Sequence, residues 1–241
     1  MSATEIIKSP GIPDKAPVIK KILEKQIPIL SEIEFAGRYT NAKMICITGS
    51  NGKSTTTMLI YHILKEAGLN VGLGGNIGKS FAKQVAFDTY DYYVLEISSF
   101  MLDNMYHFKA DIAVLLNITP DHLDRYDYKM ENYANSKFRI IQNQGKDDVF
   151  IYCTDNQEIQ SGIKKREITS QAFPFSIETT LNQGAWLEGQ QISINLNNKS
   201  QEPFTMSITE LALQGKHNIY NSMASGIVAK VLELRNESIR N

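Results

Sequence analysis

The segment TGSNGKST, residues 48–55, carries the residue types that bind a nucleoside triphosphate. Its glycines let successive backbone N–H groups face one anion, and a helix that starts at the loop adds positive potential. Lys53 can reach β- and γ-phosphate oxygens, and Ser54 can ligate magnesium. The loop departs from the G-x-x-x-x-G-K-[ST] pattern, because Ile47 stands at the first glycine position and the extra glycine is Gly49. We therefore predict a variant phosphate loop rather than a glycine turn with a solvated lysine. Its expected nucleotide contacts are Gly49, Ser50, Asn51, Gly52, Lys53, Ser54 and Thr55.

Two segments that follow apolar runs offer metal ligands. Glu96 in YYVLEISSF ends such a run, and a carboxylate beside a triphosphate is a natural magnesium ligand, although it could equally be exposed or cap a helix. Ser98 could cap the next helix or touch a ligand. His122 stands between Asp121 and Asp124, which suggests an ion site with the aspartates orienting the imidazole. A single histidine is otherwise more often structural.

Three weaker signals lie elsewhere in the chain. GGNIG at 74–78 is either a second loop where backbone approaches a ligand or a tight turn. A helix expected over 129–143 carries Lys137, and most helical lysines are simply solvated. Asn218 and Asn221 lie three residues apart at the start of the last expected helix, where their amides can read an adenine edge or merely cap and pack.

Short apolar strands alternating with helices must position these residues. The expected strands are 43–48, 69–73, 91–97, 111–118 and 148–153, and the expected helices are 53–67, 78–86, 129–143 and 217–234. Nearly continuous apolar runs are typical of strands covered on both faces of a parallel sheet. Residues 166–210 have short alternating stretches and predict an antiparallel flank. The predicted fold is α/β, a P-loop NTPase-like, mostly parallel sheet flanked by helices with a small antiparallel β flank.

The first 42 residues predict a short strand-turn-helix-strand fragment. The run Ser9–Pro13 has turn chemistry, residues 15–26 have helical spacing, and residues 27–30 form a brief apolar run. This fragment is too small to bury a core alone.

Composition narrows the class of protein. In 241 residues, 25 lysines and arginines nearly balance 26 aspartates and glutamates, so the net charge of -1 disfavours nucleic acid and membrane surfaces as partners. Hydrophobic residues make up 42%, enough for a real core. Cys46 and Cys153 lie in apolar runs and predict reduced thiols, which points to the cytoplasm. The sequence shows no secretory leader and no apolar run near the roughly 18 residues of a membrane span, so we expect a soluble protein.

The phosphate loop resembles the variant loop of the Mur ligases and their folylpolyglutamate synthetase relatives. The motifs TGSNGKST, GGNIG, YVLEISSF, LNITPDHLDRY, YANSKFRI and GKHNIYN occur in an order and spacing similar to those of the D-glutamate-adding Mur ligases, over residues 43–234. One departure is Met101, where the resemblance leads us to expect glutamine.

The resemblance implies an ATP-dependent ligase that joins D-glutamate to UDP-N-acetylmuramoyl-L-alanine through an acyl phosphate. This reaction belongs to peptidoglycan precursor synthesis in the cytoplasm, and hence to cell wall biogenesis, cell shape and cell division. The expected cofactors are ATP and two magnesium ions.

The resemblance also assigns roles to particular residues. The implied catalytic residues are Lys53, Glu96, His122 and Lys137. Ser54 and Glu96 would hold the first magnesium, and His122 with carbamylated Lys137 the second. Asn76, Ser98 and His122 would position the muramoyl substrate, and Asn218 and Asn221 would hold adenine. Carbamylation requires that burial or nearby cations lower the pKa of Lys137.

The same resemblance suggests the domain organisation. We expect residues 1–42 to be a remnant of an N-terminal UDP-binding domain and residues 43–241 to be the central ATP-binding domain, without the third domain that receives the amino acid. The isolated chain is then expected to bind ATP and magnesium but to be weak or inactive as a ligase. The alternatives are another Mur ligase, a folylpolyglutamate synthetase-like ligase, or a non-catalytic ATP-binding fragment. A transport or signalling ATPase is disfavoured, because it would leave DHLDRY and YANSKFRI without a role.

Overall fold

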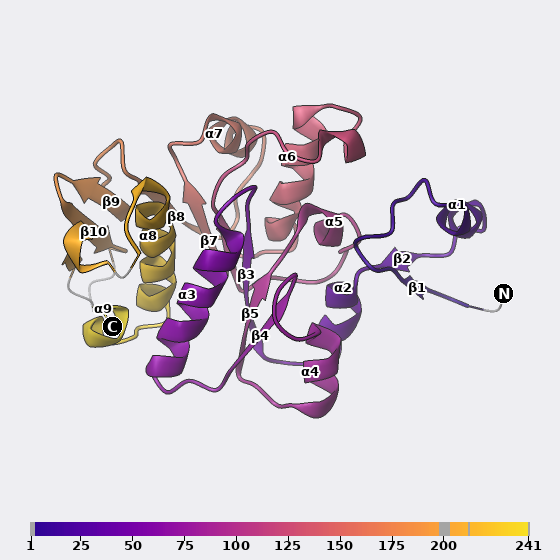
Figure 1. Ribbon diagram of the computed structural model, residues 1–241, viewed down its shortest axis with the longest axis horizontal. Coiled ribbons are helices and arrows are strands. Elements are labelled where there is room, and N and C mark those ends of the chain that lie inside the picture. The colour runs from indigo at the N-terminus through magenta and orange to yellow at the C-terminus, as the bar shows by residue number, and fades with distance from the viewer. Residues whose placement is uncertain (1–2, 198–202, 212, 241) are drawn as a thin grey trace.

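A mainly parallel sheet forms the centre of the protein, which a computed structural model describes over residues 3–197, 203–211 and 213–240. Within these residues the sheet has nine strands, in the order β11-β10-β9-β8-β7-β6-β3-β5-β4 (Figure 1). Their bounds are β3 Lys43–Thr48, β4 Val71–Gly75, β5 Tyr92–Glu96, β6 Ile112–Leu115, β7 Val149–Cys153, β8 Gln171–Ser176, β9 Gly184–Glu188, β10 Gln191–Asn195 and β11 Phe204–Ser207. Residues 44–48 and 112–115 are all buried, which confirms the prediction of strands covered on both faces.

Helices cover both faces of this sheet. The connection from β3 to β4 runs toward one edge of the sheet, and those from β6 to β7 and from β7 to β8 run toward the other. Because parallel crossovers are right-handed, α3 (Lys53–Glu66) lies on one face, and α6 (Met130–Phe138) and α7 (Gln157–Lys164) lie on the opposite face. The last long helix, α8 (Lys216–Val231), lies beside α3 (Figure 1). In the part of the chain that is described, no helix is both long and apolar enough to cross a bilayer.

The predicted antiparallel flank is only partly correct. β8 runs parallel to β7 and β9 runs parallel to β8, so the antiparallel part is limited to the pairs β9–β10 and β10–β11. The helix α7, which was not predicted, supplies the crossover that a parallel connection needs. Residues 198–202 of the predicted flank lie outside the described residues.

Several expected elements are shorter than their apolar patterns. The helix expected over 78–86 is α4 (Phe81–Phe87), because Ser80 caps it by accepting a hydrogen bond from the N–H of Lys83. The helix expected over 129–143 is α-helical to Phe138 and continues as the 3-10 helix η2 (Arg139–Ile141). A short helix, α5 (Ser99–Leu102), follows β5.

The first residues form a small lobe beside the body of the molecule (Figure 1). It contains β1 (Ile6–Ile7), α1 (Pro17–Glu24) and β2 (Ile29–Leu30), and β1 pairs with β2 in parallel. This confirms the predicted strand-turn-helix-strand fragment. Its small core of Ile19, Ile22 and Ile29 is separate from the main core. The following helix α2 (Glu32–Gly37), which was not predicted, packs Ile33 and Ala36 into the body.

Candidate active site

The phosphate loop turns sharply between β3 and α3. Gly52 begins α3 in the left-handed conformation, with φ of 81°, which favours glycine. The loop is held from the neighbouring strand end, because the N–H groups of Ser50 and Asn51 donate to the backbone and side-chain oxygens of Asn117, at 2.9 and 2.8 Å. Lys53 Nζ donates to the carbonyl oxygens of Gly49 and Ser50, both at 2.9 Å. The lysine therefore points into the loop, and burial lowers its pKa.

Glu96 is held by the side chains of two neighbouring segments, Ser54 and Asn76. Its carboxylate accepts hydrogen bonds from Ser54 Oγ at 2.7 Å and from Asn76 Nδ2 at 2.8 Å, and Glu96 is 1% exposed. A Cβ added to Gly75 would lie 2.2 Å from the backbone oxygen of Glu96. The GGNIG segment is thus a close backbone approach that presents Asn76 to Glu96. Adjacent hydroxyl and carboxylate oxygens are the donors that magnesium prefers, so Ser54 and Glu96 fit this ion.

Lys137 is buried beside the phosphate loop. Its Nζ donates to the Gly49 carbonyl at 2.8 Å, the same oxygen that Lys53 contacts, and lies 4.7 Å from the ring centroid of Tyr133. Burial and the nearby charge of Lys53 lower the pKa of Lys137 to about 7. A large share of this amine is therefore neutral near neutral pH, which is the condition that reaction with carbon dioxide requires. Tyr133 in turn hydrogen-bonds Ser50 Oγ at 3.1 Å.

His122 lies at the exposed rim of the site. Its Nε2 is 3.5 Å from Asp121 Oδ2, its side chain is 55% exposed, and its ring centroid is 5.2 Å from that of Phe100. Of the two aspartates predicted to orient the imidazole, Asp121 is the one near it, and its charge also acts on Lys53 and Lys137; among the described contacts Asp124 makes none with the imidazole. The described residues contain no cluster of three histidine, cysteine, aspartate or glutamate side chains that could hold a metal. A metal at His122 would need the carbamate or substrate oxygens as further ligands.

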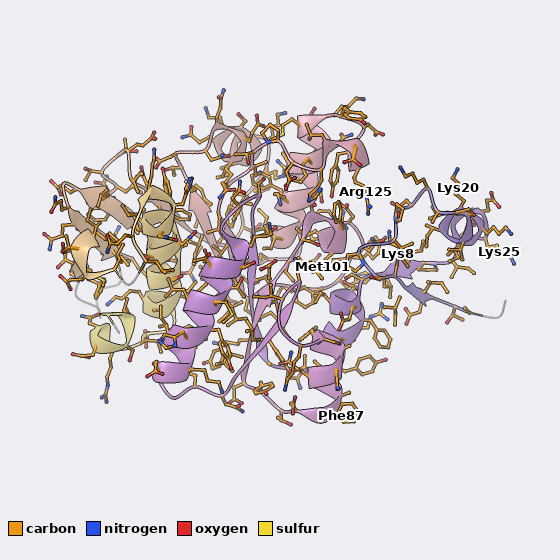
Figure 2. All side chains as sticks on the ribbon, in the orientation of Figure 1. Lys8, Lys20, Lys25, Phe87, Met101 and Arg125 are labelled. Atoms are coloured by element: carbon orange, nitrogen blue, oxygen red, sulfur yellow. The ribbon has the colours of Figure 1, made fainter. Side chains whose placement is uncertain are left out.

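Ser98 and Met101 have structural roles at the start of α5. Ser98 Oγ accepts a hydrogen bond from the Met101 N–H at 3.3 Å, which is the capping alternative. Met101 is 4% exposed and belongs to the main core (Figure 2). An apolar side chain fits this position, and a polar glutamine would need a buried partner there.

A cavity of 290 Å³ adjoins the phosphate loop on the side of α8. It is lined by Asn51, Gly52, Leu116, Asn117, Thr119, Cys153, Asp155, Asn156, Glu178, Lys216, His217, Tyr220 and Asn221. Asn221 Nδ2 donates to Asn218 Oδ1 at 3.2 Å, and Asn218 Nδ2 donates to the Gln214 carbonyl at 2.9 Å. Both amides thus pack at the start of α8 and do not cap it, since its N-cap residue is Gly215. Of the two, only Asn221 lines the cavity. Adenine binding by the pair stays a prediction.

The sequence reasoning missed two residues that shape the site. Asn117 anchors the phosphate loop, and its signal was a polar residue placed directly after an apolar strand.

Arg125 lies between the lobe and the body (Figure 2). Its guanidinium lies 4.3 Å from the centroid of Phe100 and donates to the Pro10 carbonyl at 3.3 Å. Its signal was the DHLDRY motif, whose arginine had been given no role.

The remaining residues of the predicted phosphate loop, Thr55 included, extend from β3 into the first turn of α3. Residues 49–52 form the turn itself, and Lys53, Ser54 and Thr55 lie in the first turn of α3. The fold therefore gathers the phosphate loop, Glu96, Asn76 and Lys137 at one place, with His122 at the rim and Asn218 and Asn221 beside the cavity.

Comparison with known proteins identifies the family. The model of the Mur ligase middle domain matches residues 47–229. This chain belongs to the Mur ligase family. The chain is 57% identical to the UDP-N-acetylmuramoylalanine–D-glutamate ligase of Bacteroides fragilis, over 100% of this chain and 53% of that protein. It is 54% identical to the ligase of the same name from Porphyromonas gingivalis, with the same shares covered. The chain spans about half the length of the curated relatives it matches.

Solved structures show the same fold at lower identity. The UDP-N-acetylmuramate:L-alanyl-gamma-D-glutamyl-meso-diaminopimelate ligase from Neisseria meningitides aligns with a TM-score of 0.69 at 18% identity, over 98% of this chain and 76% of that one. The UDP-N-acetylmuramate-alanine ligase MurC from Thermotoga maritima aligns with a TM-score of 0.60 at 17% identity, over 99% and 54%. The predicted Mur ligase resemblance and α/β fold class are thus confirmed.

Proposed function

We propose that this Mur ligase chain is the ATP- and magnesium-binding part of a ligase that adds D-glutamate to UDP-N-acetylmuramoyl-L-alanine. One observation carries the proposal: Lys53 and Lys137 converge on the Gly49 carbonyl, in the loop that also leads to the Ser54–Glu96 pair. The high identity to relatives named as D-glutamate ligases supports the choice of substrates.

The arrangement suits activation of a carboxylate by ATP. Amide formation needs a carboxylate oxygen to become a leaving group, and attack on the γ-phosphate provides this as an acyl phosphate that the amine of D-glutamate then opens. The protein contributes mainly positioning and charge neutralisation. Lys53 and the loop N–H groups would hold the phosphates, while Ser54 and Glu96 would hold a magnesium ion. Bound magnesium neutralises phosphate charge.

Lys137 is proposed to act as an anion. Its neutral amine would attack carbon dioxide: an N–C bond forms, one C=O π bond breaks and leaves its electron pair on oxygen, and the nitrogen loses a proton to solvent, which gives a carbamate. With His122, that carbamate would hold the second magnesium ion. The change also removes the repulsion between the Lys137 and Lys53 ammonium groups, which lie on the same carbonyl oxygen.

The remaining roles complete the proposal. Asn76, Ser98 and His122 would contact the muramoyl substrate, and Asn218 and Asn221 the adenine. Residues 43–241 would form the ATP-binding domain, and residues 1–42 part of a UDP-binding domain. The reaction would take place in the cytoplasm during peptidoglycan synthesis, and so would contribute to the cell wall, cell shape and cell division.

Two measurements test the proposed function. Isothermal titration of the chain with ATP and magnesium should show binding that Lys53→Met weakens by at least tenfold, because the proposed contact of the lysine with the phosphates would be lost. Phosphate release by the protein encoded in the full reading frame should require both UDP-N-acetylmuramoyl-L-alanine and D-glutamate. Turnover with another amino acid or with a folate acceptor would assign a different ligase. ATP binding without any acceptor-dependent release would indicate a non-catalytic protein.

A further inference from the structure

A buried hydrogen bond joins the two helices, α3 and α8, that lie beside the 290 Å³ cavity. Thr56 on α3 donates through its Oγ1 to Asn221 Oδ1 on α8, at 3.1 Å. Thr56 is fully buried and Asn221 is 6% exposed. The two helices lie side by side along one face of the sheet (Figure 1). This contact therefore links the helix that begins at the phosphate loop to the helix that lines the far side of the cavity.

Asn221 also packs against the phosphate loop itself. A Cβ added to Gly52 would lie 2.7 Å from Asn221 Oδ1, so this oxygen sits directly against the residue that begins α3. Gly52 and Asn221 both line the 290 Å³ cavity. A shift of the Asn221 amide would thus move one wall of the cavity and press on the loop that faces the phosphates.

The hydrogen-bond donors and acceptors around Asn221 determine which way its side-chain amide is turned. The Gln214 carbonyl can only accept, so Asn218 presents its Nδ2 to Gln214 and its Oδ1 to Asn221. Asn221 must then turn its Nδ2 toward Asn218, which leaves its Oδ1 to accept from Thr56. Among the described contacts, Asn221 Nδ2 uses one of its two hydrogens, toward Asn218, which leaves the second for a ligand.

We propose that Thr56 is a positioning residue of the nucleotide site, which holds the Asn221 amide in one orientation and so couples the base cavity to the phosphate loop. The inference rests on the proposed function, in which the cavity takes the base of ATP. Thr56 is fully buried and is not among the residues that line the 290 Å³ cavity. Its effect on ATP passes through Asn221 and Gly52.

The next residue provides a matched control. Thr57 is also fully buried, but its Oγ1 has no hydrogen-bond partner among the residues that the structure describes. Thr56→Val and Thr57→Val are the same nearly isosteric change in adjacent positions of one helix. They differ in that only the first removes a hydrogen bond and leaves the Asn221 oxygen buried without its donor.

The test compares ATP with inorganic tripolyphosphate, each with magnesium, by isothermal titration of the chain. Thr56→Val should weaken ATP binding by about tenfold, because an Asn221 amide that is no longer held adopts the binding orientation for only part of the time, and should weaken tripolyphosphate binding by less. Thr57→Val should bind both as the unchanged chain does. Thr56→Ser, which restores the hydroxyl, should recover ATP affinity. If Thr56→Val does not fold, Thr56→Ala takes its place, with folding followed by circular dichroism.

The outcomes separate this inference from the proposed function. Equal ATP affinities for Thr56→Val and Thr57→Val would overturn the positioning role while ATP binding stands. Equal losses for ATP and tripolyphosphate, or a failure of Thr56→Ser to recover affinity, would also overturn it. If the unchanged chain binds tripolyphosphate no less tightly than ATP, the cavity is not a base site, and both the inference and this part of the proposed function fail.

Discussion

At the scale of single residues, two lysines on one carbonyl oxygen define the electrostatics of the site. Lys53 and Lys137 both donate to Gly49 O, and Lys137 is 1% exposed, so little water reaches its ammonium group to screen it from Lys53. Two like charges in such a place favour the neutral form of one amine, and Lys137 is the more buried of the two. Conversion of Lys137 to an anion would replace this repulsion with attraction.

The lowered pKa of Lys137 predicts how stability depends on pH. Its pKa is about 7 in the folded protein against 10.5 as the ordinary value, so between these limits the unfolded chain binds more protons. The free energy of unfolding should therefore rise with pH across this window, and the cost of burying the lysine should be fully present below about pH 7. Lys137→Met should stabilise the chain most at low pH and progressively less toward pH 10.5.

Urea unfolding in buffers freed of carbon dioxide measures this effect. Lys165→Met, at an exposed position, serves as the control. A stability difference between Lys137→Met and the unchanged chain that stays constant across the window would contradict the lowered pKa.

At the scale of elements, the ends of three neighbouring strands assemble the site. β3 leads into the phosphate loop, β5 ends at Glu96, and β6 leads to Asn117, which anchors the loop. The carboxyl ends of parallel strands meet at one edge of a sheet, so residues far apart in the sequence converge there. The turn after β4 adds Asn76, and the fit between this turn and β5 depends on Gly75.

Gly75→Ala should be more harmful than Gly68→Ala. Both glycines have positive φ, 91° and 80°, so both alanine variants carry similar backbone strain, about 1–3 kcal/mol. Only at position 75 would the new Cβ meet a backbone atom, at 2.2 Å, whereas nothing lies within 4 Å at position 68. Gly75→Ala should lose about 1–3 kcal/mol more of the free energy of unfolding and weaken magnesium-dependent ATP binding, because Glu96 must shift. Chemical denaturation and ATP titration of both variants check this. Equal losses of unfolding free energy in the two variants would show that the backbone at Glu96 can move to accept the added Cβ.

At the scale of the whole molecule, the N-terminal lobe and the body differ in the size of their buried apolar cores. The lobe has a core of three isoleucines, and Val18 and Leu23 on α1 remain 51% and 52% exposed. Its attachments include a hydrogen bond from the Ser31 N–H to the Asn104 carbonyl, at 2.8 Å, and the Arg125 contact with Pro10. A small core with few attachments opens at lower free energy than a sheet buried on both faces.

Hydrogen exchange should show this difference directly. Amides of β1, α1 and β2 should exchange much faster than those of β3, β5 and β6, because only the latter lie within the buried sheet. Arg125→Ala should speed exchange in the lobe and leave the central strands unchanged. Equal protection of lobe and body would contradict this view of the molecule.

Local patterns in the sequence predicted much of the architecture. The alternation of apolar runs with helical segments predicted the parallel strands β3 to β7, and the phosphate loop was recognisable because its glycines, lysine and hydroxyls are contiguous. The crossover helix α7 was missed although Ile159 and Ile163 have the i, i+4 spacing of a helix and Asn156 caps it, because two large apolar residues in eight are a weak signal in the sequence. Without that helix, β8 could not be predicted to run parallel.

The sequence by itself determined which chemical groups are present, and its local spacing placed the phosphate loop between a strand and a helix. Only the tertiary structure decided that Lys137 reaches the same oxygen as Lys53, and that Thr56 has a hydrogen-bond partner while Thr57 has none within the described part of the chain. The physical reason is that burial, lost hydration and hydrogen-bond partners depend on segments distant in sequence that pack around a group. Those properties turn a common residue type into a particular site.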